Sequence, residues 1–165
     1  MRRISASLVL IASLALAGCA GMMREQPAPG DSFDAVVQKF GQPTGRYPDA
    51  GGEVFEYATG PMGQYTWMAR FGPDRRLASF EQVLSSAGFA RIKVDSATKA
   101  DVLRLIGRPA ERSHVALKNY EVWSYRYKES GVWDSMMHVH FDDAGVVRMM
   151  LNGPDPVYDK MFWRD

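Results

Sequence analysis

The stretch DVLRLIGRP at residues 101–109 has a counterpart earlier in the chain, DAVVQKFGQP at residues 34–43. Two further pairs follow in the same order: EVFEY (53–57) with EVWSY (121–125), and WMARFGPDRRL (67–77) with MHVHFDDAGVV (137–147). The spacing drifts slowly, since Gly107 follows Gly41 by 66 residues, Glu121 follows Glu53 by 68 and Phe141 follows Phe71 by 70. An ordered repeat of this kind indicates a duplicated unit with short loop insertions. We therefore predict two tandem domains, at residues 31–84 and 85–152.

Each repeated stretch predicts an amphipathic helix. In the first copy Asp31 can cap the helix, Gly41 can end it, and apolar residues recur at i, i+3, i+4 and i+7, namely Phe33, Val36, Val37 and Phe40. In the second copy Thr98 and Asp101 resemble a capping box, and Gly107 ends the helix. Residues 85–92 predict one more short helix before it.

Three strands are expected to follow each helix, because aromatic and β-branched residues alternate there with Gly, Pro and Asp turns. Their predicted ranges are 53–58, 64–71 and 77–84 in the first copy, and 120–128, 135–141 and 146–151 in the second. The predicted fold is α+β, a tandem repeat of a helix(-helix)-three-stranded antiparallel unit with the helices on one face of the sheet. We expect the two copies to pair into a longer sheet whose other face stays open.

The N-terminus has the layout of a secretory signal peptide, with a basic start at Arg2 and Arg3 followed by an uncharged apolar run at residues 4–16. The run is short for a membrane-spanning helix, which needs about 20 apolar residues. A spanning segment and a buried structural thiol at Cys19 are the alternatives. We predict a signal peptide at residues 1–18, a linker at 19–30, and a C-terminal tail at 153–165.

Residues 16–19, Leu-Ala-Gly-Cys, resemble the bacterial lipobox. The resemblance implies a covalent lipid on Cys19, and Ala20 is similar to lipoproteins sorted to the outer membrane. Two or three acyl chains hold a protein durably at a membrane, whereas one does not. We therefore expect a chain anchored by lipid to the periplasmic face of the outer membrane. Cleavage before Cys19 leaves 18 basic and 19 acidic residues, so no cationic excess points to nucleic acid.

The lipobox, a helix ending in G-x-P, a strand with V-W-x-Y and a strand ending in F-D-x-x-G together resemble the BamE/SmpA/OmlA lipoprotein family. The matching residues are 107–109, 122–125 and 141–145. The family implies an accessory subunit of the outer-membrane β-barrel assembly machinery with a helix–helix–three-strand fold. A typical member has one domain, so two copies depart from the pattern. Tandem copies of this shape also resemble the secreted beta-lactamase inhibitor protein.

No phosphate-binding loop, nucleophile elbow, catalytic triad or HExxH helix is found, and we predict no enzyme and no cofactor beyond the lipid. His138 and His140 lie two apart on a predicted strand and so share one face. With His114 or Asp142 they form an alternative zinc ligand set, but the simpler interpretation is two imidazoles on the open sheet face. The ten methionines raise the possibility of copper binding, but they do not form a spaced thioether motif. No metal site is predicted.

Partner-binding residues are expected among the aromatics and the two histidines, as Trp and Tyr are enriched in interface hot spots. The candidates are Tyr65, Trp67, Trp123, Tyr125, Tyr127, His138 and His140. Core packing under the helices is the alternative for the rings. The expected function is a non-catalytic interaction module for an envelope protein, with the β-barrel assembly machinery as one candidate partner. A tandem-domain inhibitor or ligand-binding protein using the open sheet face is the other interpretation. The tail is expected to cover a sheet edge, and a short exposed binding segment is the alternative.

Overall fold

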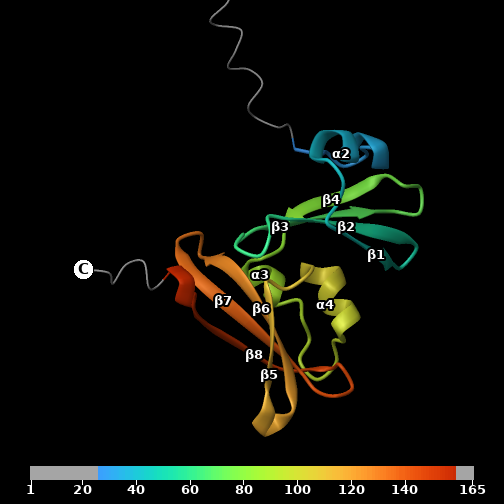
Figure 1. Ribbon diagram of the computed structural model, residues 1–165. Coiled ribbons are helices and arrows are strands. Elements are labelled where there is room, and N and C mark those ends of the chain that lie inside the picture. Colours follow the sequence, from blue (N-terminus) through green and yellow to red (C-terminus); the bar gives the residue numbers. More distant parts are fainter. Residues whose placement is uncertain (1–25, 159–165) are drawn as a thin grey trace, which may run out of the picture.

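The computed structural model describes residues 26–158 and has an α+β fold with two four-stranded antiparallel sheets (Figure 1). The first sheet has the order β1-β2-β3-β4 and the second β5-β6-β7-β8. Among the described residues no helix is long and apolar enough to cross a membrane. The first unit comprises α2 (Phe33–Phe40), β1 (Gly45–Asp49), β2 (Gly52–Ala58), β3 (Thr66–Phe71) and β4 (Leu77–Gln82). The second comprises α3 (Ser86–Phe89), α4 (Lys99–Ile106), β5 (Glu111–Val115), a 3-10 turn (Ala116–Lys118), β6 (Tyr120–Glu129), β7 (Trp133–Phe141) and β8 (Val147–Pro154).

Helix α2 covers one face of the first sheet. Its N-cap is Ser32, whose hydroxyl accepts a hydrogen bond from the Ala35 amide, so the prediction of Asp31 as cap was wrong by one residue. The Asp31 carboxylate instead pairs with Lys39 at 3.0 Å. A compact aromatic core lies beneath the helix, built from Val36, Phe55, Tyr57, Ala69, Phe71 and Leu77.

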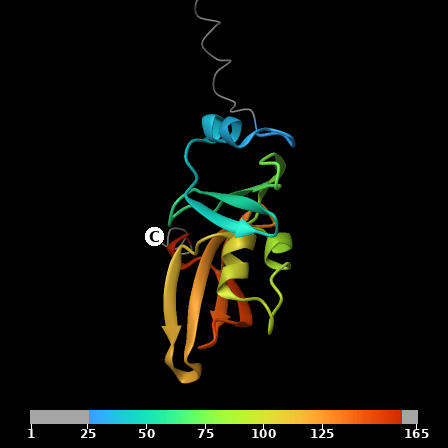
Figure 2. The ribbon, with the colours of Figure 1, turned by 90° about the vertical axis from the view of Figure 1, so that its right-hand side faces the viewer.

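The opposite face of the first sheet packs on the second unit. Val54 and Met68 share one buried cluster with Val102 and Ile106 of α4 and with the core of the second sheet. Arg70 of β3 donates to the carbonyl of Arg104 at the end of α4, 3.0 Å away. The layers therefore run α2, first sheet, α3 with α4, second sheet, as Figures 1 and 2 show from two sides.

Two predictions about the sheets were wrong. The copies do not pair into one longer sheet, and the first sheet has no open face. The reason lies in β2, where Val54 to Tyr57 are all buried, so both faces of the sheet exclude water and need a cover. Helix α4 supplies the second cover while it also packs on the second sheet. Within residues 26–158, only the second sheet keeps an uncovered outer face over part of its area.

Each sheet also has a fourth strand that was not predicted. β1 (GRYPD) and β5 (ERSHV) are short, polar or Gly- and Pro-containing, and both lie at a sheet edge. Every residue of β5 is exposed, so it lacks the apolar alternation that marks a half-buried strand. Short polar edge strands limit unwanted strand pairing, and propensity alone does not identify them.

The glycines that end the two main helices are in equivalent conformations but different surroundings. Gly41 and Gly107 have φ of 85° and 83°, in a region that only glycine adopts readily. A Cβ on Gly41 would meet nothing within 4 Å. A Cβ on Gly107 would lie 3.0 Å from Glu56 Cδ and 3.2 Å from Met68 Cε. At Gly107 the second unit therefore lies close against the first sheet.

We expect Gly107→Ala to lower the free energy of unfolding more than Gly41→Ala. Both substitutions pay a backbone strain of about 1–3 kcal/mol. Gly107→Ala also overpacks the junction, which typically adds about 1–3 kcal/mol. Urea denaturation of the two variants measures the difference. Equal losses would contradict a tight junction at this position.

Candidate interaction site at the end of the second sheet

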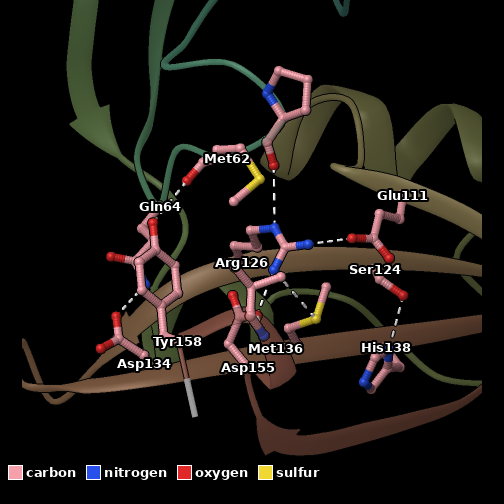
Figure 3. A network of polar contacts seen from close by, with 12 residues as sticks. Met62, Gln64, Glu111, Ser124, Arg126, Asp134, Met136, His138, Asp155 and Tyr158 are labelled. Atoms are coloured by element: carbon pink, nitrogen blue, oxygen red, sulfur yellow. Dashed lines mark hydrogen bonds and ion pairs between the residues drawn. The ribbon is translucent and has the colours of Figure 1, made fainter. Parts of the chain in front are cut away.

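Arg126 is the centre of a buried polar network at one end of the second sheet. It extends from β6 toward the outer face, away from α3 and α4, and its side chain is only 3% exposed. Its guanidinium pairs with Asp155, which is fully buried, and with Glu111 on β5. Its Nε donates to the carbonyl of Pro61, 3.2 Å away in the loop between β2 and β3 (Figure 3). One side chain thus joins β5, the first unit and the segment after β8.

The loop at residues 59–65 is held against the second sheet by further contacts. Gln64 Nε2 donates to Asp134 Oδ1 at 2.5 Å, and the Tyr158 hydroxyl donates to the Met62 carbonyl at 3.3 Å. Lys128 pairs with Asp134 at 2.8 Å. These hydrogen bonds from Lys128 and then Gln64 lower the pKa of Asp134. The loop is therefore attached at three points, through its residues Pro61, Met62 and Gln64.

Several large apolar side chains remain exposed around this attachment, and we call them the apolar rim. They are Met62 (52% exposed), Tyr65 (44%), Val132 (65%) and Trp133 (69%), with the partly exposed Tyr158 beside them. Tyr158 contacts Met62, and Gln64 and Asp134, the sequence neighbours of Tyr65 and Trp133, are hydrogen-bonded, so these residues lie at the same end of the second sheet. Trp133 pairs with Glu129 and therefore points to the opposite face of β7 from Asp134. Single exposed apolar residues are common, but several gathered at one end of a sheet offer apolar area to a partner.

Residues 153–158, the described part of the predicted tail, contribute to this site. The prediction that the tail covers a sheet edge also concerns residues 159–165 and stays a prediction. Residues 153–154 extend β8, itself an edge strand, and Asp155 then caps the turn that follows by accepting the Val157 amide at 3.0 Å. The same carboxylate holds Arg126. Residues 159–165 lie outside the described residues, as do the signal peptide and Cys19.

Most of the predicted aromatic anchors lie in the core. Trp123, Tyr125 and Tyr127 are 3%, 1% and 1% exposed and pack beneath α3 and α4. Trp67 is partly buried on the α2 side of the first sheet, where it stacks on Phe80 at 5.3 Å. These rings therefore pack in the interior or under a helix and do not line an open face, because alternate residues of β3 and β6 point toward the helices. Of the five predicted rings, Tyr65 is the exposed one.

The rim residues Trp133, Val132 and Met62 were not predicted. They lie in or beside connections that were interpreted only as turns, between the strands at 53–58 and 64–71 and between those at 120–128 and 135–141. The available signal was the unusual presence of Val132 and Trp133 directly after Gly131, since turn positions are mostly polar.

His138 and His140 do share the outer face of the second sheet, as their spacing predicted. His138 Nδ1 is hydrogen-bonded to Ser124 Oγ at 2.8 Å. His140 is 7% exposed, and neither of its ring nitrogens has a hydrogen-bond partner among the described residues. Burial lowers the pKa of both imidazoles, and for His140 the charges of His138 and Lys118 lower it further.

His114 and Asp142, the other ligands of the alternative zinc site, do not lie beside His138 and His140. His114 pairs with Glu121 in the β5–β6 register, on the helix-facing side of the sheet, and its ring contacts Asn119 at 3.0 Å. Asp142 is held by Arg148 at 2.7 Å. Within residues 26–158, no group of three or more His, Cys, Asp or Glu side chains is arranged to hold a metal ion.

A pocket of about 280 Å³ lies between the two units, lined by Glu56, Pro61, Thr66, Leu84, Tyr125 and Arg126 among others. Pockets for drug-sized ligands have volumes of roughly 300–1,000 Å³, so this one is at or below the lower limit. A more open hollow of about 390 Å³, lined mainly by charged residues such as Asp49, Arg70 and Arg91, lies within that range.

No protein-family model matches the chain, and no curated protein sequence matches it. Among solved structures, the chain is similar to a DUF4309 family protein (YjgB) from Bacillus subtilis subsp. subtilis str. 168, at 13% identity and a TM-score of 0.27, over 74% of this chain and 76% of that one. A TM-score this low supports no inference about the fold or the function of the chain.

Proposed function

We propose that the chain is an outer-membrane-anchored periplasmic lipoprotein that acts as a non-catalytic protein–protein interaction module in outer-membrane protein assembly or envelope maintenance. The observation that carries the proposal is the apolar rim. Trp, Tyr and Met side chains are enriched in interaction hot spots, and the rim gathers them at the end of the second sheet that carries the charged pair Lys128–Asp134. An apolar centre with polar groups beside it has the composition of a transient interface.

The rim is suited to binding because its main loop is already fixed. Side chains and loops that become ordered on binding reduce affinity, at about 0.5–1.5 kcal/mol per immobilised side chain. Arg126 and Gln64 hold the 59–65 loop in place before any partner arrives. In this proposal the lipid on Cys19 sets the location, and the 19–30 linker gives a reach of about 35 Å when extended.

The resemblance to the BamE/SmpA/OmlA family suggests the partner class, namely the β-barrel assembly machinery or another envelope protein. The competing proposal of an inhibitor with a tandem concave sheet has less support, because helix α4 occupies the second face of the first sheet. Such an inhibitor could bind its target only through the outer face of the second sheet, and part of that face lies under the 59–65 loop.

A crosslinking pull-down from detergent-solubilised envelope tests the proposal. We expect Trp133→Ser to reduce recovery of the partner about tenfold or more, since removing a hot-spot aromatic typically costs at least about 2 kcal/mol of binding. Leu117→Ser is the matched control, because Leu117 is 93% exposed but lies before β6, at the other end of the second sheet. Equal recovery with both variants, or no envelope protein above background, would contradict the proposal.

A further inference from the structure

Three side chains that can donate to a metal meet on the outer face of the second sheet. His138 and His140 are two residues apart on β7, and Met149 is the direct partner of His140 on β8. Directly paired residues in an antiparallel sheet have Cβ atoms about 4.5–5.5 Å apart and point to the same side. Residues two apart on a strand are separated by about 6.6 Å. The three side chains are therefore close enough to converge on one ion.

The hydrogen bonding leaves donor atoms free. Both nitrogens of His140 are buried and unpartnered among the described residues, although buried polar atoms are normally satisfied. His138 engages Ser124 through Nδ1, which leaves its Nε2 unused by the described residues. Metal-binding histidines typically use one ring nitrogen for a second hydrogen bond that fixes the ring and the tautomer. Ser124 is placed to do this for His138.

The chemistry of the donors selects the kind of ion. The two imidazoles are borderline donors that suit copper or zinc, and the soft thioether favours Cu(I) over hard divalent cations. The nearby charges agree with this choice. The positive charge of Lys118 near His140 disfavours an ion of high positive charge there. The negative charge of Glu111, which influences His138, is already paired with Arg126.

We propose that His138, His140 and Met149 form a binding site for a soft monovalent metal ion, Cu(I). The site lies away from the apolar rim on the same sheet and is independent of the proposed protein partner. Cu(I) binds without a change of oxidation state, and only coordination bonds to the three side chains form.

Titration of the full-length lipoprotein in detergent with Cu(I) under anaerobic conditions, against a chromogenic Cu(I) chelator, tests the site. We expect one equivalent of Cu(I) to bind, Met149→Leu to weaken binding by at least tenfold, and Ser124→Ala to weaken it by about tenfold through the loss of ring orientation. The matched control is Met150→Leu, because Met150 is the adjacent methionine and packs against the core on the helix-facing side. This control is expected to bind like the wild type.

Circular dichroism and urea denaturation establish that each variant is folded before binding is compared. X-ray absorption at the copper edge is expected to show a sulfur scatterer that disappears in Met149→Leu. Failure to bind stoichiometric Cu(I), equal binding by Met149→Leu and Met150→Leu, or stoichiometric Zn(II) binding without Cu(I) binding would each overturn the proposal. None of these outcomes depends on the envelope partner.

Discussion

Replacing Asp155 with alanine is expected to lower the free energy of unfolding by about 3 kcal/mol. Asp155 is fully buried and pairs with Arg126, whose side chain is 3% exposed. Removing one partner of a buried ion pair leaves the other charge uncompensated, which typically costs about 3–5 kcal/mol. We expect the lower end of this range because Glu111, which is 56% exposed, still pairs with Arg126.

Urea denaturation measures this loss as a lower midpoint at an unchanged slope. Lys39→Ala is the matched control, since the Lys39–Asp31 pair is 3.0 Å long but its side chains are 32% and 25% exposed. Pairs with this much solvent contact contribute about 0–1 kcal/mol. If Asp155→Ala and Lys39→Ala destabilise the protein equally, Arg126 does not hold the two units and the C-terminal segment together in the way described.

The repeat itself was the most informative feature of the sequence. Gly41 and Gly107 were predicted to end two helices, and α2 and α4 end at Phe40 and Ile106. The predicted strands at 53–58 and 120–128 correspond to β2 (Gly52–Ala58) and β6 (Tyr120–Glu129). These elements were predictable because their signals are local: helical apolar spacing, a capping box at Thr98, and glycine at a left-handed position.

The arrangement of the units was not predictable from local signals. Whether Trp123 or its neighbour Ser124 faces the helices depends on register, and β6 is buried on both faces from Val122 to Tyr127. A strand without clear alternation leaves its faces ambiguous. The second role of α4, which packs on both sheets, depends on contacts between residues more than thirty positions apart, such as Arg70 with Arg104.

The candidate site was hidden for a related reason. Tyr65 was predicted as a contact residue, but Trp133 is brought to the same end of the sheet by the hydrogen bond between Gln64 and Asp134, which are 70 residues apart. The burial of Arg126 could not be predicted from the sequence either, since a charged residue in a strand is normally exposed. Its partners come from three separate segments, at Pro61, Glu111 and Asp155.

The central claim is that the apolar rim contacts an envelope protein while the chain is held at the outer membrane. Site-specific photo-crosslinking tests this directly, because we expect a crosslinked product from positions in the rim and none from a remote position. A photoreactive amino acid replaces Trp133, Tyr65 or Leu117 in the full-length protein in intact cells. Positions 133 and 65 lie in the rim, whereas position 117 is more exposed than either but remote from it. Only a surface buried by a partner places the probe within bonding distance of another protein.

We expect positions 133 and 65 to give the same crosslinked envelope protein and position 117 to give none. The rim crosslinks should also be lost when Cys19→Ser removes the lipid attachment, because the chain then leaves the membrane while its folded part is unchanged. Identical products from 117 and 133 would contradict the account. So would the absence of any product from 133 in a folded, membrane-anchored protein.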